Sequence, residues 1–195
     1  MKNIIGLTGP TGAGKSTFSS VAEQKGFMLI DCDKISRHVT EKGSECLKKL
    51  AEEFGEDILN YGVLDRKLLA KRAFSHKEKK EKLEEIIFPF ILNIVMEKIN
   101  NAESDNILLD APTLFESGID EMCGTVVAIL CPIEKRRARI ISRDGLSAEQ
   151  AEIRLSAGKP DDFYKDRADF VLSSDTDEAE YITACNELLD KLLEE

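Results

Sequence analysis

The sequence lacks any hydrophobic run long enough to cross a membrane, and its start lacks the charged, apolar and small-residue regions of a secretory signal. The first residues lead instead directly into an apolar strand pattern. The 195 residues are 42% hydrophobic and 33% charged, which is typical of globular proteins, and this length suits one large domain. We therefore expect a cytoplasmic protein with no membrane association.

Histidine and paired cysteines are also scarce. The chain has two histidines and five cysteines, and no two cysteines form a C-x-x-C pair, so we do not expect a structural zinc site. An odd number of cysteines without a secretory signal indicates reduced thiols. No obvious activating partner accompanies a cysteine in the sequence, which argues against a cysteine nucleophile.

Basic residues are outnumbered by acidic ones, 27 to 37, and the net charge is −10. This balance argues against a large nucleic-acid surface, because phosphate backbones are bound by an excess of lysine and arginine. A small polyanion needs only a local positive pocket. We expect small-molecule partners, no nucleic acid, and a monomer or weak homo-oligomer.

The clearest positive signal begins at the ninth residue, where Gly9 to Ser16 spell G-x-x-x-x-G-K-[ST]. Glycines let successive backbone N–H groups point at one anion. Lys15 then reaches the β and γ phosphates of a nucleotide, and the Ser16 hydroxyl is a ligand for Mg²⁺. The motif predicts a site for ATP or GTP with Mg²⁺, formed by Gly9, Thr11, Gly12, Ala13, Gly14, Lys15, Ser16 and Thr17.

The surroundings of the motif strengthen this prediction. The apolar run from Ile4 to Leu7 predicts a buried strand before the loop, and Phe18 and Val21 at helical spacing predict a helix from Lys15 onward. Such a helix directs the positive end of its dipole at bound phosphates. The alternative is a glycine-rich turn that binds nothing.

Five short apolar runs predict strands, and helical stretches separate them, as in an α/β fold with a parallel sheet. We expect strands at Ile4–Leu7, Phe27–Ile30, Ile107–Leu109, Val126–Leu130 and Phe170–Leu172. We divide a single domain into a core of residues 1–33, 104–146 and 168–195, a helical insertion of residues 34–103 and a lid of residues 147–167. The insertion shows helical patterns and no convincing strand.

Two carboxylates, Asp31 and Asp33, end the second predicted strand, where side chains of such sheets emerge beside a ligand. In an extended segment both point the same way, so that one contacts substrate or magnesium while the other accepts the proton of an alcohol. The alternative is a turn that caps a helix beginning near Lys34, because aspartate is a favoured cap.

Asp110 ends the third predicted strand and is a second candidate to bind Mg²⁺, directly or through water. Pro112 and Leu114 follow it in a loop that we expect to shape the pocket for the phosphoryl acceptor. A purely structural role for Asp110 is equally consistent with the sequence.

The densest basic segment contains Arg136, Arg139 and Arg143, which share one stripe of a helix. Guanidinium groups on this stripe would stabilise charge on a transferring phosphoryl group. A solvated face paired with carboxylates is the alternative. Arg66 is a candidate to bind a phosphate of the acceptor, although the neighbouring Asp65 could neutralise it.

Taken together, these segments resemble the dephospho-coenzyme A kinase family through most of the chain. The resemblance lies in the phosphate loop with its entry Leu7-Thr8-Gly9, in Ile30-Asp31-Cys32-Asp33 with Arg37, in Gly62-x-Leu64-Asp65-Arg66-x-x-Leu69, in Asp110-x-Pro112-x-Leu114-Phe115-Glu116, in Arg139-x-x-x-Arg143-Asp144-x-Leu146-Ser147 and in Ala168-Asp169-Phe170-Val171. The sequence departs from the family pattern at Phe88, Thr113, Gly158 and Ser173-Ser174, the last of these in place of an asparagine near the adenine.

The resemblance implies a P-loop kinase-type fold, with three α/β/α layers around a five-stranded parallel sheet, and an ATP-dependent transfer to the 3′-hydroxyl of dephospho-CoA. It implies that Asp33 is the base, that Lys15 holds ATP, and that Arg139 and Arg143 approach the phosphates. It places Asp31, Arg37, Arg66, Asp110, Pro112 and Leu114 at the acceptor.

Two other functions are alternatives to the phosphorylation of dephospho-CoA. The first is a kinase of another small acceptor, such as a nucleoside monophosphate or a sugar acid, because one scaffold serves many chemistries. The second is a GTP-driven switch. Such switches read guanine with N-K-x-D or T-K-x-D, and the sequence contains neither an Asn-Lys nor a Thr-Lys pair.

Overall fold

A computed structural model of the chain describes residues 2–194, and these residues form two compact units. The first unit contains the residues up to Ile30 together with those from Ala102 onward, and the second contains Asp31–Asn101. Among the described residues, no helix combines the length and the hydropathy needed to cross a membrane.

The first unit is built on the five-stranded parallel sheet that the sequence predicts, and its strands lie in the order β2-β5-β1-β6-β7. The central strand β1 pairs in parallel with β5 on one side and with β6 on the other, and β7 pairs in parallel with β6. The strands are β1 Asn3–Thr8, β2 Met28–Asp31, β5 Asn106–Asp110, β6 Thr125–Leu130 and β7 Phe170–Ser173. Each overlaps a predicted strand, since continuous apolar runs between polar turns are typical of buried parallel strands.

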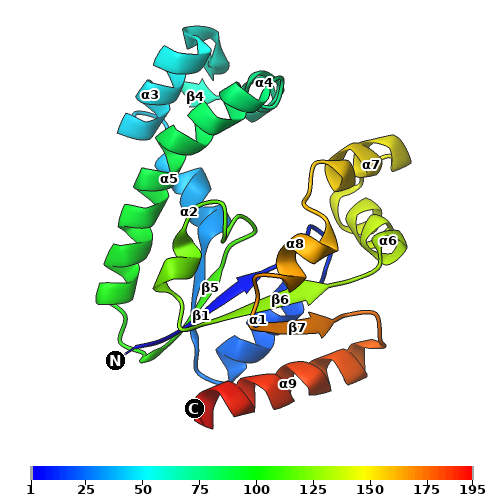
Figure 1. Ribbon diagram of the computed structural model, residues 1–195. Helices are drawn as coiled ribbons and strands as arrows, with labels where there is room; N and C mark the ends of the chain where they lie inside the picture. Colours follow the sequence, from blue (N-terminus) through cyan, green and yellow to red (C-terminus); the bar gives the residue numbers. More distant parts are fainter. Residues whose placement is uncertain (1, 195) are drawn as a thin grey trace. The chain divides into compact units, whose positions relative to one another are not determined.

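Two helices, α1 (Lys15–Gln24) and α9 (Glu178–Glu194), pack against each other on one face of this sheet (Figure 1). Their apolar stripes meet the side chains of β1 and β6, and Phe18 and Leu189 are fully buried there. Burial of a side chain of this size stabilises the fold by about 1.5–3 kcal/mol. This packing fixes the start of α1, and with it the phosphate loop, against the middle of the sheet.

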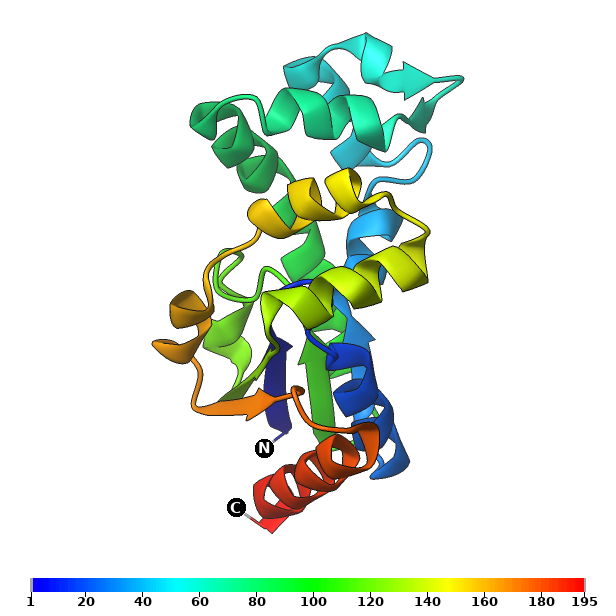
Figure 2. The same cartoon turned by 90° about the vertical axis from the view of Figure 1, so that its right-hand side faces the viewer.

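The short helix η2 (Ile119–Met122) contacts β1, and the loop after β5 and the helix α8 (Asp161–Lys165) contact β6 through a separate group of apolar side chains. Helix α6 (Ile133–Asp144) follows β6, and α7 (Ala148–Ser156) packs along it, as Figure 2 shows for the yellow helices. The predicted lid is therefore not a plain loop, because α7 and α8 occupy most of it. Pro160, which interrupts the helical pattern, is the N-cap residue of α8.

The second unit is a helical cluster around α5 (Lys77–Asn100), which is 24 residues long. Helices α2 (Cys32–Val39), α3 (Glu45–Phe54) and α4 (Arg66–Ala73) all contact α5 (Figure 1). One expectation is wrong here: after the short helix η1 (Glu56–Ile58), β3 (Leu59–Asn60) and β4 (Val63–Leu64) form a two-stranded antiparallel hairpin. Strands of two residues are too short to show an alternating apolar pattern.

The first turns of α5 are rich in charged side chains that pair with one another along the helix. Lys77 pairs with Glu81 at 3.5 Å and Lys80 with Glu84 at 3.3 Å, each pair four residues apart along the helix. Exposed pairs of this kind stabilise a helix by only about 0.3–0.5 kcal/mol each. The segment is therefore a solvated helix surface rather than a binding tail.

Candidate functional site

The phosphate loop connects β1 to α1 and lies against β6. Gly9, Gly12 and Gly14 have φ angles of 136°, 78° and 102°, conformations that residues with a side chain rarely adopt. A Cβ atom at Gly9 would lie 2.2 Å from the backbone oxygen of Ile129 in β6. The glycine is therefore required by the close approach of two backbones as well as by its own φ angle.

Helix α1 begins at Lys15, as predicted, with Gly14 as its N-cap residue. Because the cap carries no side chain, the amides and the positive dipole end of the helix face the loop directly. The Lys15 ammonium donates hydrogen bonds to the carbonyl oxygens of Gly9 at 2.8 Å and Pro10 at 3.5 Å. Its charge is thus folded over the loop, where a polyphosphate would complement it.

Asp110 and Ser16 offer oxygen atoms of the kind that Mg²⁺ prefers. Asp110 is the last residue of β5, next to Leu7 of β1, and its Oδ2 atom accepts a hydrogen bond of 3.2 Å from Ser19. Ser16 precedes Ser19 by three residues on α1, so that both lie on one face of that helix. The donor set fits a magnesium ion carried by a nucleotide. Within residues 2–194, no group of three or more His, Cys, Asp and Glu side chains is placed to hold a metal ion.

Arg139 of α6 contacts the loop from the carbonyl side. Its Nη1 atom donates to the carbonyl oxygens of Gly12 at 3.2 Å and Ala13 at 3.3 Å, and to the Ser174 hydroxyl at 2.8 Å. Its Nη2 atom donates to the Ser174 carbonyl oxygen at 3.0 Å. Arg139 therefore lies beside the phosphate loop, and its donors bond protein atoms there.

The other two arginines of the predicted stripe lie in different surroundings. Arg136 is buried, and its guanidinium lies 3.5 Å from Asp161 of α8, so that it links α6 to α8. Arg143 is exposed and donates to both carboxylate oxygens of Asp144, at 2.7 and 2.9 Å. The Arg143 hydrogen bond holds the pKa of Asp144 below its ordinary value of 3.8. The three arginines of α6 therefore form neither a single stripe that faces the phosphates nor a single solvated face.

The loop after β5 corrects one expectation. Leu114 is fully buried, and its methyl groups lie against Gly6 of β1, where an added Cβ would be 2.9 Å away. It is a core residue and offers no surface to an acceptor. Pro112, two residues earlier, is half-buried and keeps an exposed edge.

The second unit contains the predicted carboxylates. Asp31 is the N-cap residue of α2: its Oδ1 atom accepts a hydrogen bond of 2.9 Å from the Lys34 amide, and its Oδ2 atom lies 3.2 Å from the Lys34 ammonium. The premise of an extended segment is therefore wrong, because the helix begins at Cys32. Asp33 lies in the first turn of α2 and is exposed, and Arg37 follows one turn later, also exposed.

Arg66 joins these residues from a different helix. Its Nη2 atom donates to the Thr40 hydroxyl at 2.8 Å and to the Arg37 carbonyl oxygen at 3.4 Å, at the C-terminal end of α2. Asp65 accepts two amide hydrogen bonds as the N-cap of α4, so its carboxylate serves the helix start. The structure thus places the Arg66 guanidinium at the end of α2 that carries Arg37, where it bonds the Arg37 backbone.

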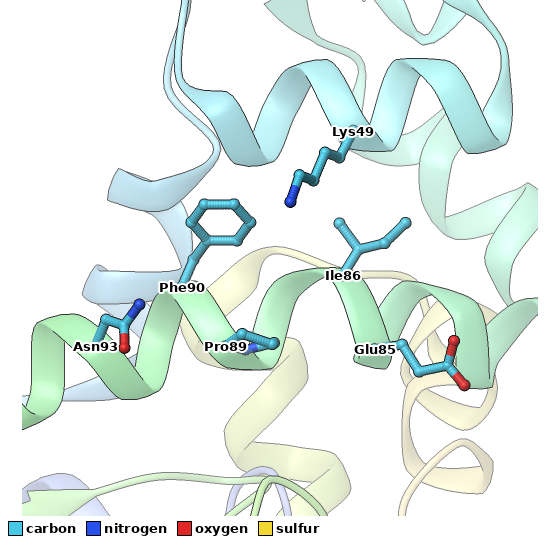
Figure 3. Close-up of a pocket in the computed structure, with 6 residues that line it drawn as sticks. All are labelled: Lys49, Glu85, Ile86, Pro89, Phe90 and Asn93. Carbon is cyan, nitrogen blue, oxygen red and sulfur yellow. The ribbon is translucent and has the colours of Figure 1, made fainter.

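A pocket of about 350 Å³ lies between α3 and α5 in the second unit (Figure 3). The Lys49 ammonium points into it, 5.3 Å from the centre of the Phe90 ring, and Ile86 and Pro89 form its apolar floor. None of the predicted site residues lines this pocket. It is an apolar hollow with one cation, which the sequence patterns did not indicate.

Two residues that contact the phosphate loop were missed by the sequence analysis. Ser174, directly after β7, donates to the Ala13 carbonyl oxygen at 2.6 Å, and Tyr181 of α9 donates to that of Gly14 at 3.2 Å. Both follow the loop by more than 150 residues; Tyr181 belongs to no motif, and Ser174 stood out only as a departure from the family pattern, not as a loop contact. A local signal therefore could not have identified them.

The fold and this loop define the class of protein: a parallel sheet with a G-x-x-x-x-G-K-[ST] loop between β1 and α1, and a helical unit inserted after β2, is a P-loop kinase of small molecules. Comparisons with known proteins identify the family. The family model described as dephospho-CoA kinase matches residues 3–180. The chain belongs to the dephospho-CoA kinase family.

Individual relatives agree with this assignment. Dephospho-CoA kinase from Fusobacterium nucleatum is 37% identical over 174 residues, which cover 89% of this chain and 90% of that protein. Dephospho-CoA kinase from Campylobacter jejuni is 31% identical, with a TM-score of 0.71 over 98% of each chain. A crystal structure from Thermus thermophilus is also 31% identical, with a TM-score of 0.84 over 98% of each chain. The predicted family and enzyme class are confirmed.

Proposed function

We propose that the protein transfers the γ-phosphoryl group of Mg-ATP to the 3′-hydroxyl of dephospho-CoA, which gives coenzyme A and ADP, the last step of coenzyme A synthesis. The observation that carries the proposal is the phosphate loop with Lys15 folded over it, in a chain of the dephospho-CoA kinase family. We further propose that the enzyme acts in the cytoplasm as a monomer or weak homo-oligomer.

The nucleotide would be held by the loop from Gly9 to Thr17. The loop amides and Lys15 bind the phosphates, and Ser16, with Asp110 directly or through water, holds Mg²⁺, which neutralises charge on the β and γ phosphates. Arg143 would leave its carboxylate partner to approach the transferring group. Arg139 would support the loop while it contacts the nucleotide.

Asp33 would be the general base. The hydroxyl oxygen of the acceptor forms a bond to the γ-phosphorus, the bond to the bridging oxygen of ADP breaks, and the hydroxyl proton passes to the Asp33 carboxylate. The exposure of Asp33 in the first turn of α2 supports this role, because its carboxylate is available to a ligand. Asp31 orients that turn as its cap.

Cations of the second unit would bind the acceptor. Arg66 bonds the C-terminal end of α2, and Arg37 is exposed one turn beyond Asp33, so that both add positive charge to this helix in an otherwise acidic chain. A phosphate of dephospho-CoA is the complementary group. Pro112 would contribute an edge of the acceptor pocket.

The experiment is to measure ADP release after addition of dephospho-CoA, with nucleoside monophosphates and sugar acids as alternative acceptors. A preference for one of these acceptors over dephospho-CoA would reject the proposed substrate. The variant Asp33→Asn should bind ATP normally and turn over about 10² to 10⁴ times more slowly.

The matched control is Glu52→Gln, which removes one carboxylate from an exposed position of α3 in the same unit. Its turnover should equal that of the wild type. Wild-type turnover in Asp33→Asn would remove Asp33 from the role of base.

A further inference from the structure

Three consecutive carbonyl groups of the phosphate loop accept hydrogen bonds from side chains outside the loop. Arg139 donates to Gly12 and Ala13, Ser174 donates to Ala13, and Tyr181 donates to Gly14. These donors come from α6, from the residue after β7 and from α9. Ser174 and Tyr181 contact the carbonyl side of the loop, opposite to the side that a phosphate would occupy.

Ser174 is held firmly in place. Its amide donates to the Leu130 carbonyl oxygen at 2.9 Å, and its side chain is buried, with 1% of the residue exposed. The hydroxyl accepts from Arg139 at 2.8 Å and donates to Ala13 at 2.6 Å. A charged donor polarises the hydroxyl, which strengthens the hydrogen bond that the hydroxyl donates.

Tyr181 presents its hydroxyl from the packed face of α9. The residue is 4% exposed and belongs to the apolar group beneath the sheet, with Phe18 and Cys185. Burial raises the pKa of Tyr181 far above its usual range, so that the phenol stays protonated as a donor. Its hydrogen bond to the Gly14 carbonyl is 3.2 Å long.

Fixing these carbonyl groups fixes the loop amides. A trans peptide is planar, and its N–H points opposite to its C=O; no cis peptide occurs among the described residues. The Ala13 carbonyl therefore sets the direction of the Gly14 amide, and the Gly14 carbonyl sets that of the Lys15 amide. Both amides face away from Ser174 and Tyr181, toward the phosphate side.

We propose that Ser174 and Tyr181 are positioning residues for the nucleotide, which hold the amides of Gly14 and Lys15 aimed at the phosphates. This inference rests on the proposed function only in taking the loop as the phosphate site. The resemblance to the family implies an asparagine near the adenine in place of Ser173-Ser174, so the alternative is that Ser174 reads the base. The two roles differ in which part of the nucleotide they affect.

The experiment uses the whole chain and measures the dissociation constants of ATP and of inorganic tripolyphosphate by titration calorimetry. In Tyr181→Phe, which removes only the hydroxyl, both constants should rise together by about three- to tenfold, the effect of one lost hydrogen bond. In steady-state assays the KM for ATP should rise by the same factor, with kcat and the KM for dephospho-CoA unchanged. Ser174→Ala should weaken both ligands at least as much, because it also removes an acceptor of Arg139.

The matched control is Thr183→Val on the same helix, whose hydroxyl bonds the Ala179 carbonyl within α9 at 2.9 Å. It should leave both dissociation constants unchanged, and a loss equal to that of Tyr181→Phe would overturn the proposal. Unchanged tripolyphosphate binding in Tyr181→Phe and Ser174→Ala would also overturn it, whether or not ATP binding weakens. Because calorimetry needs no acceptor, a wild type that is inactive with dephospho-CoA would contradict the proposed function alone.

Discussion

The variant Gly9→Ala should disable the phosphate loop through a backbone collision. The added Cβ would lie 2.2 Å from the Ile129 oxygen, whereas real Cβ contacts are not found below 3.0 Å, so the loop and β6 must separate by at least about 0.8 Å. A shift of this size at a reacting centre costs about 10²-fold in rate. The φ angle of 136° adds about 1–3 kcal/mol of strain to the folded state.

A second glycine separates the collision from the strain. Gly26 has a φ angle of 87°, and a Cβ there would meet nothing within 4 Å, so Gly26→Ala carries only the conformational cost of about 1–2 kcal/mol. Both variants should lower the thermal unfolding midpoint, and Gly9→Ala should also lower kcat/KM for ATP about 10²-fold relative to Gly26→Ala. If kcat/KM is equal in the two variants, the argument from the contact with β6 is refuted.

The remaining predictions concern two charged side chains. Lys15→Ala should weaken ATP binding and lower kcat about 10²- to 10³-fold in the ADP-release assay, since it removes the charge held over the loop; an unchanged kcat at saturating ATP would deny Lys15 a role in the transition state. Arg72 donates a hydrogen bond of 2.7 Å to Asp57, which lowers the pKa of that carboxyl below 3.8. Wild type should therefore be more stable than Arg72→Ala above pH 3.8, and the difference should shrink in thermal unfolding as the pH falls below that value; a constant difference would contradict this assignment.

The parts of the fold that the sequence predicts well are those encoded locally. Each apolar run became a strand within one or two residues, and Lys15 begins α1 as the motif requires. Buried parallel strands and glycine-rich loops depend on a few adjacent residues, so they can be predicted from a short stretch of sequence alone. The helix α6 was predicted for the same reason.

The expectation that Asp31 and Asp33 lie in an extended segment failed at a short connection, and the alternative of a helix cap holds for Asp31. Strand β2 passes into α2 without an intervening loop, so Asp31 ends one element and caps the next. The spacing of Ile35 and Val39 after Cys32 carries the signal for a helix that begins at once. The expectation that both side chains point the same way holds only in a strand, and β2 ends at Asp31.

Burial was harder to predict than secondary structure. Leu114 follows Pro112 in a loop, and a loop residue is expected at the surface, yet its side chain fills the space beside Gly6 of β1. Arg136 and Arg143 were predicted on one stripe of a helix, yet Arg136 is buried against α8 and Arg143 is exposed. Both outcomes depend on elements distant in the sequence, which periodicity alone does not describe.

The phosphate loop shows why the residues of the loop itself can be predicted from the sequence, whereas the side chains that bond its carbonyl groups cannot. The side of the loop that we propose binds phosphate is shaped by glycines, whose spacing is fixed by the backbone path and therefore forms a motif. The opposite side consists of carbonyl groups that any donor can satisfy, provided that it is buried and correctly placed. Here the donors are a guanidinium, a serine and a tyrosine from three elements. Any hydrogen-bond donor can bond these carbonyl groups, so the positions opposite them require no particular type of side chain. These residues therefore have to be found from contacts in the folded chain.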